Sequence, residues 1–151
     1  MRAFARFLAT TAYTGFFPVA PGTVGALVVL ILLLALGSPG FWGLVLWSLV
    51  VFTVGVWASG EAERDYGHDA GKINIDEVVG MLLAALGAGG GTLSLILAFL
   101  LFRVFDVVKP FPADAAQSLP GGWGVMVDDV VAGLYAAVAT LLLRWLVAAV
   151  F

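Results

Sequence analysis

Residues Val78–Phe102 read VVGMLLAALGAGGGTLSLILAFLLF, and the interpretation of this stretch decides the fold. Its length is close to that of one membrane span, which takes about 20 apolar residues. A single crossing would leave the acidic residues before and after it on opposite sides of a membrane. The segment Gly87–Gly91 contains four glycines, a density that breaks helices. We therefore predict two shorter helices, Asp76–Leu86 and Thr92–Val108, that form a hairpin and return the chain to its starting side.

The apolar character of this stretch extends over nearly the whole chain. Of 151 residues, 62% are hydrophobic and 11% charged, and the mean hydropathy is +1.09. These values exceed those of a soluble core and predict one integral membrane domain, residues 1–151. The net charge of −3 and the lack of a basic patch give no indication of a nucleic-acid partner. Cysteine is absent, which excludes disulfides, thiolate metal sites and cysteine nucleophiles.

The remaining apolar segments predict an all-α membrane bundle. Arg2–Tyr13 has an apolar face and is predicted as an interfacial helix rather than a cleavable signal. A loop rich in proline and glycine follows, with Thr23 as the predicted N-cap of a helix at Val24–Leu36. Further helices are predicted at Phe41–Ala58 and Val125–Val150. The expected architecture is an N-terminal interfacial helix plus about five membrane helical segments, including the short central hairpin.

All ten acidic residues lie in two windows, Glu61–Glu77 and Asp106–Asp129, which the predicted hairpin brings to the same side. Two adjacent pairs, Asp76-Glu77 and Asp128-Asp129, open apolar helices, where the helix dipole favours anions. For a single pair, an ordinary acidic first turn is an equally good explanation. With Asp106, the two pairs supply five carboxylates for a hard cation. Oxygen ligands, without cysteine and with one histidine, favour Mg²⁺ over zinc.

The other charged residues have more varied interpretations. Arg103, Asp106 and Lys109 recur at intervals of three, which indicates either a self-neutralising helix end or cations that bind phosphate. His68 could donate a proton to a leaving group or simply form local hydrogen bonds. Arg144 is expected to snorkel or to pair with a lipid phosphate. Four further acids are predicted to be solvated loop charges: Glu61, Glu63, Asp65 and Asp114.

Several ordered motifs carry a resemblance to a known family. They are Thr14-Gly15-Phe16 with Pro18–Gly25, His68-Asp69 with Ile73 and Asp76–Met81, Phe102-Arg103 with Asp106, Lys109-Pro110 and Pro112, and Gly121-Gly122 with Gly124–Met126, Asp128-Asp129 and Ala132-Gly133. Together they resemble phosphatidylglycerophosphatase A of bacterial membranes. The resemblance implies Mg²⁺-dependent hydrolysis of phosphatidylglycerophosphate to phosphatidylglycerol and phosphate, on the cytoplasmic side of the inner membrane.

The resemblance also assigns roles to the matched residues. It implies metal ligands at Asp76, Glu77, Asp106, Asp128 and Asp129, which with His68 and Asp69 form the predicted catalytic set. Arg103 and Lys109 are implied phosphate contacts, and Thr23 and Lys72 complete the predicted substrate-binding set. The partners expected are the lipid substrate and the membrane lipids, while the oligomeric state is left open.

Two other classes of function are weighed against a phosphatase. A lipid head-group phosphotransferase could use the same residue types, but the Asp-Gly-x-x-Ala-Arg pattern of CDP-alcohol phosphotransferases does not occur here. A cation channel or transporter would place its acids in the middle of a span rather than at helix ends. Within a phosphatase, either water or an aspartate could be the nucleophile. The missing Asp-x-Asp signature of many aspartyl-phosphate enzymes favours water.

Overall fold

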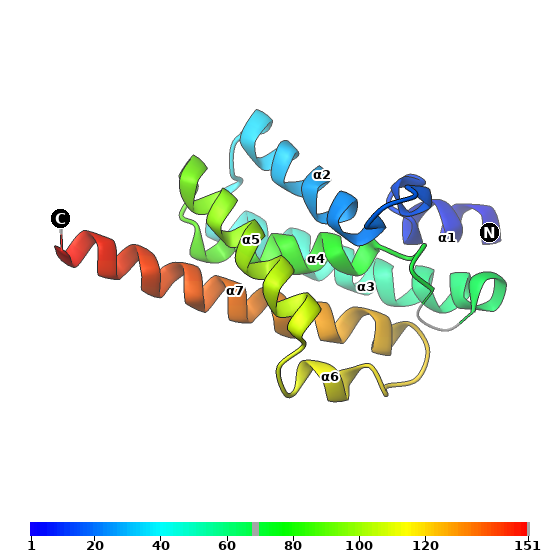
Figure 1. Cartoon of the computed structure of the whole chain (residues 1–151). Helices are drawn as coiled ribbons and strands as arrows, with labels where there is room; N and C mark the ends of the chain where they lie inside the picture. Colours follow the sequence, from blue (N-terminus) through cyan, green and yellow to red (C-terminus); the bar gives the residue numbers. More distant parts are fainter. Residues whose placement is uncertain (68–69, 151) are drawn as a thin grey trace.

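In the computed structural model, which describes residues 1–67 and 70–150, every regular element is a helix (Figure 1). No strand occurs in these ranges, so the all-α prediction is confirmed. Two short 3-10 helices lie at Thr14–Phe16 and Ala85–Gly87. The α-helices are α1 (Arg2–Ala9), α2 (Pro21–Leu36), α3 (Gly40–Tyr66), α4 (Ile75–Ala84), α5 (Thr92–Val108), α6 (Ala113–Ala116) and α7 (Gly122–Val150).

Helix α4 forms the centre of the bundle. It contacts α2, α3, α5 and α7, and most of its residues are buried. The longest helix, α7, runs along it, and α2 starts close to α4 but diverges from it toward the other end of the molecule (Figure 1). The first turns of α2 and α4 are therefore close together, whereas their far ends are separated.

The predicted hairpin is confirmed. Helix α4 passes into the 3-10 turn Ala85–Gly87, and Gly89 and Gly90 then adopt φ values of +60° and +82°. Glycine reaches this left-handed region without the steric cost that other residues meet. Helix α5 runs back from there and has the predicted bounds, while α4 ends two residues earlier than predicted because its last turn tightens to 3-10.

Both N-terminal helix predictions need correction at one end. The first helix was predicted to reach Tyr13, but α1 ends at Ala9 because residues 11–13 all have positive φ. Helix α2 begins at Pro21, whose fixed φ suits the first helical position, and Ala20 is its N-cap. The prediction of Thr23 as N-cap is therefore wrong, since Thr23 lies inside the first turn of α2.

The two longest helices also extend beyond their predicted bounds. Helix α3 continues to Tyr66 instead of ending at Ala58, supported by an ion pair of 2.8 Å between Arg64 and Glu61 one turn apart. Glu61, Glu63 and Asp65 are therefore helical charges, not the loop charges predicted. Helix α7 begins at Gly122 rather than Val125, which places Asp128-Asp129 beyond its first turn.

Two of these helices are long and apolar enough to cross a membrane. They are α3 and α7, and both expose many large apolar side chains, such as Leu46 and Trp47 on α3 and Leu142 and Trp145 on α7. Exposed apolar surface of this extent fits contact with lipid rather than water. The structure thus fits a helical membrane protein.

Candidate active site

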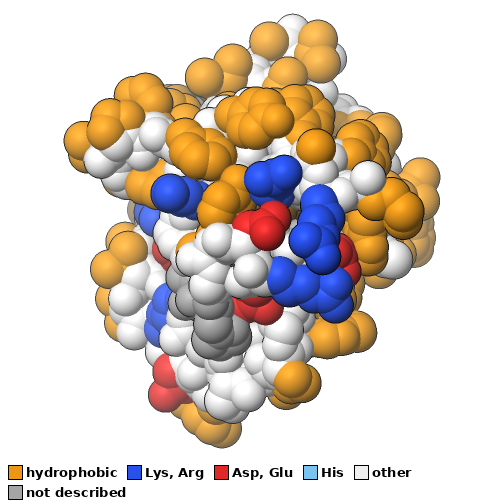
Figure 2. All heavy atoms as spheres, turned by 90° about the vertical axis from the view of Figure 1, so that its right-hand side faces the viewer, with side chains coloured by type: hydrophobic (Ala, Val, Ile, Leu, Met, Phe, Trp, Pro, Cys, Tyr) orange, Lys and Arg blue, Asp and Glu red, His pale blue; other side chains and the backbone are white. Residues whose placement is uncertain are grey.

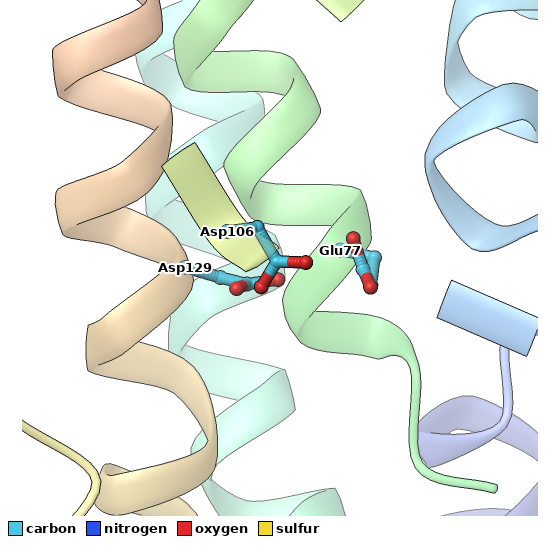
Figure 3. A group of neighbouring side chains, drawn as sticks. All are labelled: Glu77, Asp106 and Asp129. Carbon is cyan, nitrogen blue, oxygen red and sulfur yellow. The ribbon is translucent and has the colours of Figure 1, made fainter. Parts of the chain in front are cut away.

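Carboxylates from three helices meet at the end of the bundle where α4 begins. Asp76 and Glu77 lie in the first turn of α4, Asp106 lies near the end of α5, and Asp128-Asp129 lie on α7. Oxygen atoms of Glu77, Asp106 and Asp129 all lie within 4.8 Å of one another, and Figure 3 shows these three side chains together. Both acidic windows of the sequence therefore contribute to one cluster.

Two glycines set the spacing between α4 and α7. A Cβ on Gly133 would lie 2.4 Å from the carbonyl oxygen of Gly80, and one on Gly80 would lie 3.0 Å from the carbonyl oxygen of Asp129. Gly80 follows Glu77 by three residues and Gly133 follows Asp129 by four, so each glycine shares a helix face with its acid. Contact through small residues, a common way for membrane helices to pack, thus brings Asp129 close to Glu77.

Asn74 connects the start of α4 to the N-terminal segments. Its buried side-chain amide donates hydrogen bonds of 3.0 Å to the hydroxyl of Thr14 and to the carbonyl oxygen of Pro21. These bonds hold the first turn of α2 against that of α4, where a Cβ on Gly22 would lie 1.9 Å from Oε1 of Glu77. Glycine at position 22 leaves room for the carboxylate, which a larger residue would displace.

Two cations from the end of α5 balance part of the acid cluster. Nη1 of Arg103 forms ion pairs with Glu77 and, at 3.1 Å, with Asp106. Nζ of Lys109 donates to Oδ2 of Asp128 at 2.6 Å. Burial lowers the pKa of the Lys109 ammonium, but Asp128 and the neighbouring carboxylates outweigh that effect and raise this pKa above its ordinary value. Lys109 therefore keeps its positive charge at neutral pH.

The charged side chains line a cavity of about 410 Å³ that reaches the first turn of α2. Figure 2 looks at this end of the molecule, where Lys and Arg side chains gather around acidic ones and hydrophobic surface lies on either side. The lining residues are Ala20, Pro21, Gly22, Gly71, Ile73, Asp76, Glu77, Arg103, Asp106, Val107, Lys109, Asp128 and Asp129. All five predicted metal ligands are in this set, as are Arg103 and Lys109.

The cavity has features that suit a divalent cation. Five carboxylates and two cations leave three formal negative charges uncompensated. Within the described part of the chain, Oδ1 of Asp76 and Oδ2 of Asp129 are buried and accept no hydrogen bond, which is costly for a carboxylate. A hard cation would provide both oxygens with a partner. Because the charged ligands are all oxygen atoms, the set fits Mg²⁺.

Lys72 lies outside this cavity, in a neighbouring hollow. Its Nζ is 5.4 Å from the ring centre of Phe16 and 5.5 Å from that of Tyr66, distances typical of cation–π contacts. The hollow shares Pro21 and Gly71 with the acidic cavity, so the two adjoin. Lys72 is thus placed beside the cluster rather than within it.

Other residues singled out in the sequence do not line the cavity. Thr23 lies in the first turn of α2 but is not among the lining residues. Asp114 is exposed as predicted, but it lies on the short helix α6 rather than in a loop, and it accepts a hydrogen bond from the N–H of Ala115. The predicted catalytic residues His68 and Asp69 lie outside the described residues.

The comparisons with known proteins agree with the geometry. The family model of phosphatidylglycerophosphatase A matches residues 7–144, which is most of the chain. The chain belongs to the phosphatidylglycerophosphatase A family. As a member of this family it is an enzyme, a phosphatase of lipid phosphates. The phosphotransferase and channel alternatives lose their support.

Three named bacterial proteins are similar to this chain. A protein of Bacteroides thetaiotaomicron named putative phosphatidylinositol-3-phosphatase is 39% identical, with 89% of each chain covered. Phosphatidylglycerophosphatase A of Haemophilus influenzae is 35% identical over 83% of this chain and 80% of its own. The enzyme of the same name from Escherichia coli is 33% identical over 82% of this chain and 74% of its own. No solved structure matches the chain.

Proposed function

We propose that this phosphatase hydrolyses phosphatidylglycerophosphate to phosphatidylglycerol and phosphate, and that it requires Mg²⁺. The observation that carries the proposal is the cavity in which five carboxylates lie beside Arg103 and Lys109 at one end of an apolar bundle. Such a cavity combines ligands for a metal with cations for a phosphate. The family and two relatives named phosphatidylglycerophosphatase A support the substrate.

The metal ligands would come from the buried cluster. Glu77, Asp106 and Asp129 are the first choice because their oxygens lie within 4.8 Å of one another, and Asp76 and Asp128 lie beside them. Mg²⁺ bound there would act as a Lewis acid that polarises the phosphate. Without it, the acid cluster would repel the phosphate dianion.

Arg103 and Lys109 would bind the phosphate to be released. Arginine carries five N–H donors, so Arg103 can contact phosphate oxygens while it keeps an acidic partner. Lys109 contributes a charge that its raised pKa keeps in place. Both cations would stabilise the negative charge that develops on the phosphoryl oxygens in the transition state. Thr23, in the first turn of α2 and outside the cavity lining, would contact a part of the head group that extends beyond the cavity.

Water is the proposed nucleophile. Its oxygen forms the new bond to phosphorus while the bond from phosphorus to the lipid oxygen breaks. The carboxylate of Asp76, which is outside the first choice of metal ligands, would take the proton from this water. A proton must also reach the departing lipid alcohol, and His68, which precedes Asp69 in the sequence, is the residue proposed for that step.

A second substrate is favoured by one comparison. The relative from Bacteroides thetaiotaomicron is named for phosphatidylinositol 3-phosphate, and it is 39% identical. Both lipids carry a phosphomonoester and a phosphodiester. The hollow that contains Lys72 adjoins the acidic cavity and would accept the phosphodiester of either lipid. Lys72 would thus favour lipids with two phosphates over phosphatidate.

The proposed location is the bacterial cytoplasmic membrane with the site facing the cytoplasm. Six of the seven Lys and Arg residues lie on the segments that meet at the acidic end of the bundle, and Arg144 lies toward the other end of α7 (Figure 1). Excess positive charge marks the cytoplasmic side of membrane proteins.

The decisive experiment measures phosphate release from detergent-solubilised phosphatidylglycerophosphate, with Mg²⁺ and after chelation. We expect chelation to abolish activity, and Asp76→Asn or Asp129→Asn to lower kcat by about a hundredfold or more. Asp114→Asn is the matched control, because Asp114 is exposed on α6. Full activity in both site variants would rule out this site. Phosphatidylinositol 3-phosphate and phosphatidate, assayed in parallel, rank the substrates.

The nucleophile has its own test. A single turnover in ¹⁸O-labelled water should place the label in the released phosphate. Label that appears in the enzyme and not in the phosphate would contradict direct attack by water and indicate an aspartyl-phosphate.

A further inference from the structure

A second cavity, also of about 410 Å³, lies between α2, α3 and α4. Its walls include Val29, Leu32 and Leu36 from α2, Trp47 from α3, and Val78 and Leu82 from α4. Every large side chain in the lining is apolar. We refer to this cavity as the α2–α4 groove.

The groove continues from the acidic cavity along two shared helices. The first turn of α2, at Pro21 and Gly22, lines the acidic cavity, and the same helix then forms one wall of the groove. On α4, Glu77 lines the acidic cavity and the next residue, Val78, lines the groove. Along this stretch α2 diverges from α4 (Figure 1). The acidic cavity and the groove thus follow one another along α2 and α4.

The groove lies at a depth that the acyl chain of a bilayer lipid can reach. Along α2, Val29 lies seven residues and Leu36 fourteen residues beyond Gly22. At 1.5 Å per residue these positions are about 10 Å and about 21 Å from the acidic cavity. One leaflet has a hydrocarbon thickness of about 15 Å, half that of the bilayer core. The α2 wall of the groove thus lies at the depth of the far part of an acyl chain whose phosphate is in the acidic cavity.

We propose that the α2–α4 groove holds one acyl chain of the lipid substrate. This inference rests on the proposed function, because it places the phosphate of the same lipid in the acidic cavity. Transfer of an acyl chain from bilayer to groove adds little hydrophobic free energy, since lipid tails are as apolar as leucine. The groove instead fixes the direction in which the tail of the bound lipid extends from the acidic cavity. It thereby orients the phosphate of the lipid against the acids.

The test compares dipalmitoyl and dihexanoyl phosphatidylglycerophosphate in the same detergent, with the ratio of their kcat/KM values as the readout. Leu32→Trp fills the groove, and Ile31→Trp is the matched control on the adjacent, similarly exposed residue (51% and 54%) that does not line it. We expect Leu32→Trp to lower the ratio of long-chain to short-chain activity by about tenfold. The control should keep the ratio of the unsubstituted enzyme.

A second variant tests the depth of the groove. Leu36→Trp blocks its far end, so it should lower activity on dipalmitoyl lipid while didecanoyl lipid, whose chains are shorter, is hydrolysed normally. Equal ratios in Leu32→Trp, Ile31→Trp and the unsubstituted enzyme would overturn the proposal, as would equal loss on all chain lengths. No phosphate release from either lipid by the unsubstituted enzyme would instead refute the proposed function, so the two failures are distinguishable.

Discussion

Replacement of Gly133 by alanine is expected to disable the site without touching any charged residue. The new Cβ would lie 2.4 Å from the carbonyl oxygen of Gly80, whereas ordinary contacts begin at 3.4 Å. Helices α4 and α7 must therefore separate by about 1 Å. That shift moves Asp129 away from Glu77, and a misplacement of this size costs about a hundredfold in rate. The overpacking itself should lower the free energy of unfolding by about 1–3 kcal/mol.

The assay is phosphate release from detergent-solubilised lipid, with kcat compared at saturating Mg²⁺ and the thermal midpoint recorded on the same sample. Gly60→Ala is the matched control, because a Cβ there would lie 3.5 Å from the nearest atom, the backbone nitrogen of Gly122, which is ordinary contact. The control should keep its activity. A folded Gly133→Ala enzyme with unchanged kcat would refute the idea that the glycine contact sets the spacing of the acids.

Three further outcomes follow from the geometry. Asn74→Ala removes two hydrogen bonds of a buried side chain and should lower the free energy of unfolding by about 2 kcal/mol in denaturant titrations. An unchanged free energy of unfolding would contradict the role of Asn74 in positioning α2. Mg²⁺ should raise the thermal midpoint of the unsubstituted enzyme but not that of Asp129→Asn, and an equal rise in both would locate the metal elsewhere. Arg144→Leu should leave kcat unchanged, because Arg144 lies fifteen residues, or about 22 Å, beyond Asp129 and donates its hydrogen bond to the carbonyl oxygen of Gly87. A large loss of kcat would show that the far end of α7 affects catalysis.

The sequence was sufficient to predict the hairpin and the residues that form the acid cluster. Gly87–Gly91 contains enough glycine to break a helix, a local property that composition reveals. Once the chain turns there, the acidic start of α4, the end of α5 and the acid pair of α7 share one end of the bundle. Five predicted metal ligands and two predicted phosphate contacts line the same cavity for that reason.

The residues that position the cluster could not be predicted in the same way. Asn74 acts through partners at Thr14 and Pro21, more than fifty positions away, and a single sequence gives no indication of such pairs. The contact of Gly80 with Gly133 also joins distant segments. One signal was available: each glycine lies one helical turn from an acid, a spacing that indicates a shared face.

The helix ends were predicted least well, for a local reason. Helix α3 continues through its charged end because Ala62 is buried against the neighbouring segments, so packing outweighs the polar sequence there. Helix α1, in contrast, ends before its predicted end because residues 11–13 adopt positive φ values. Such turns are determined by tertiary contacts, and helix propensity does not take those contacts into account.

Helix α7 determines the depth at which the chemistry takes place. Twenty-one helical residues follow Asp129 up to Val150. At 1.5 Å each they measure about 32 Å, close to the thickness of the hydrocarbon core of about 30 Å. A membrane-crossing α7 therefore places the acid pair at the boundary between hydrocarbon and head groups. A lipid need not be lifted out of the bilayer to react there, whereas a soluble phosphate ester would have to descend among the head groups. Preference for lipid phosphates thus follows in part from the position of two aspartates along one helix.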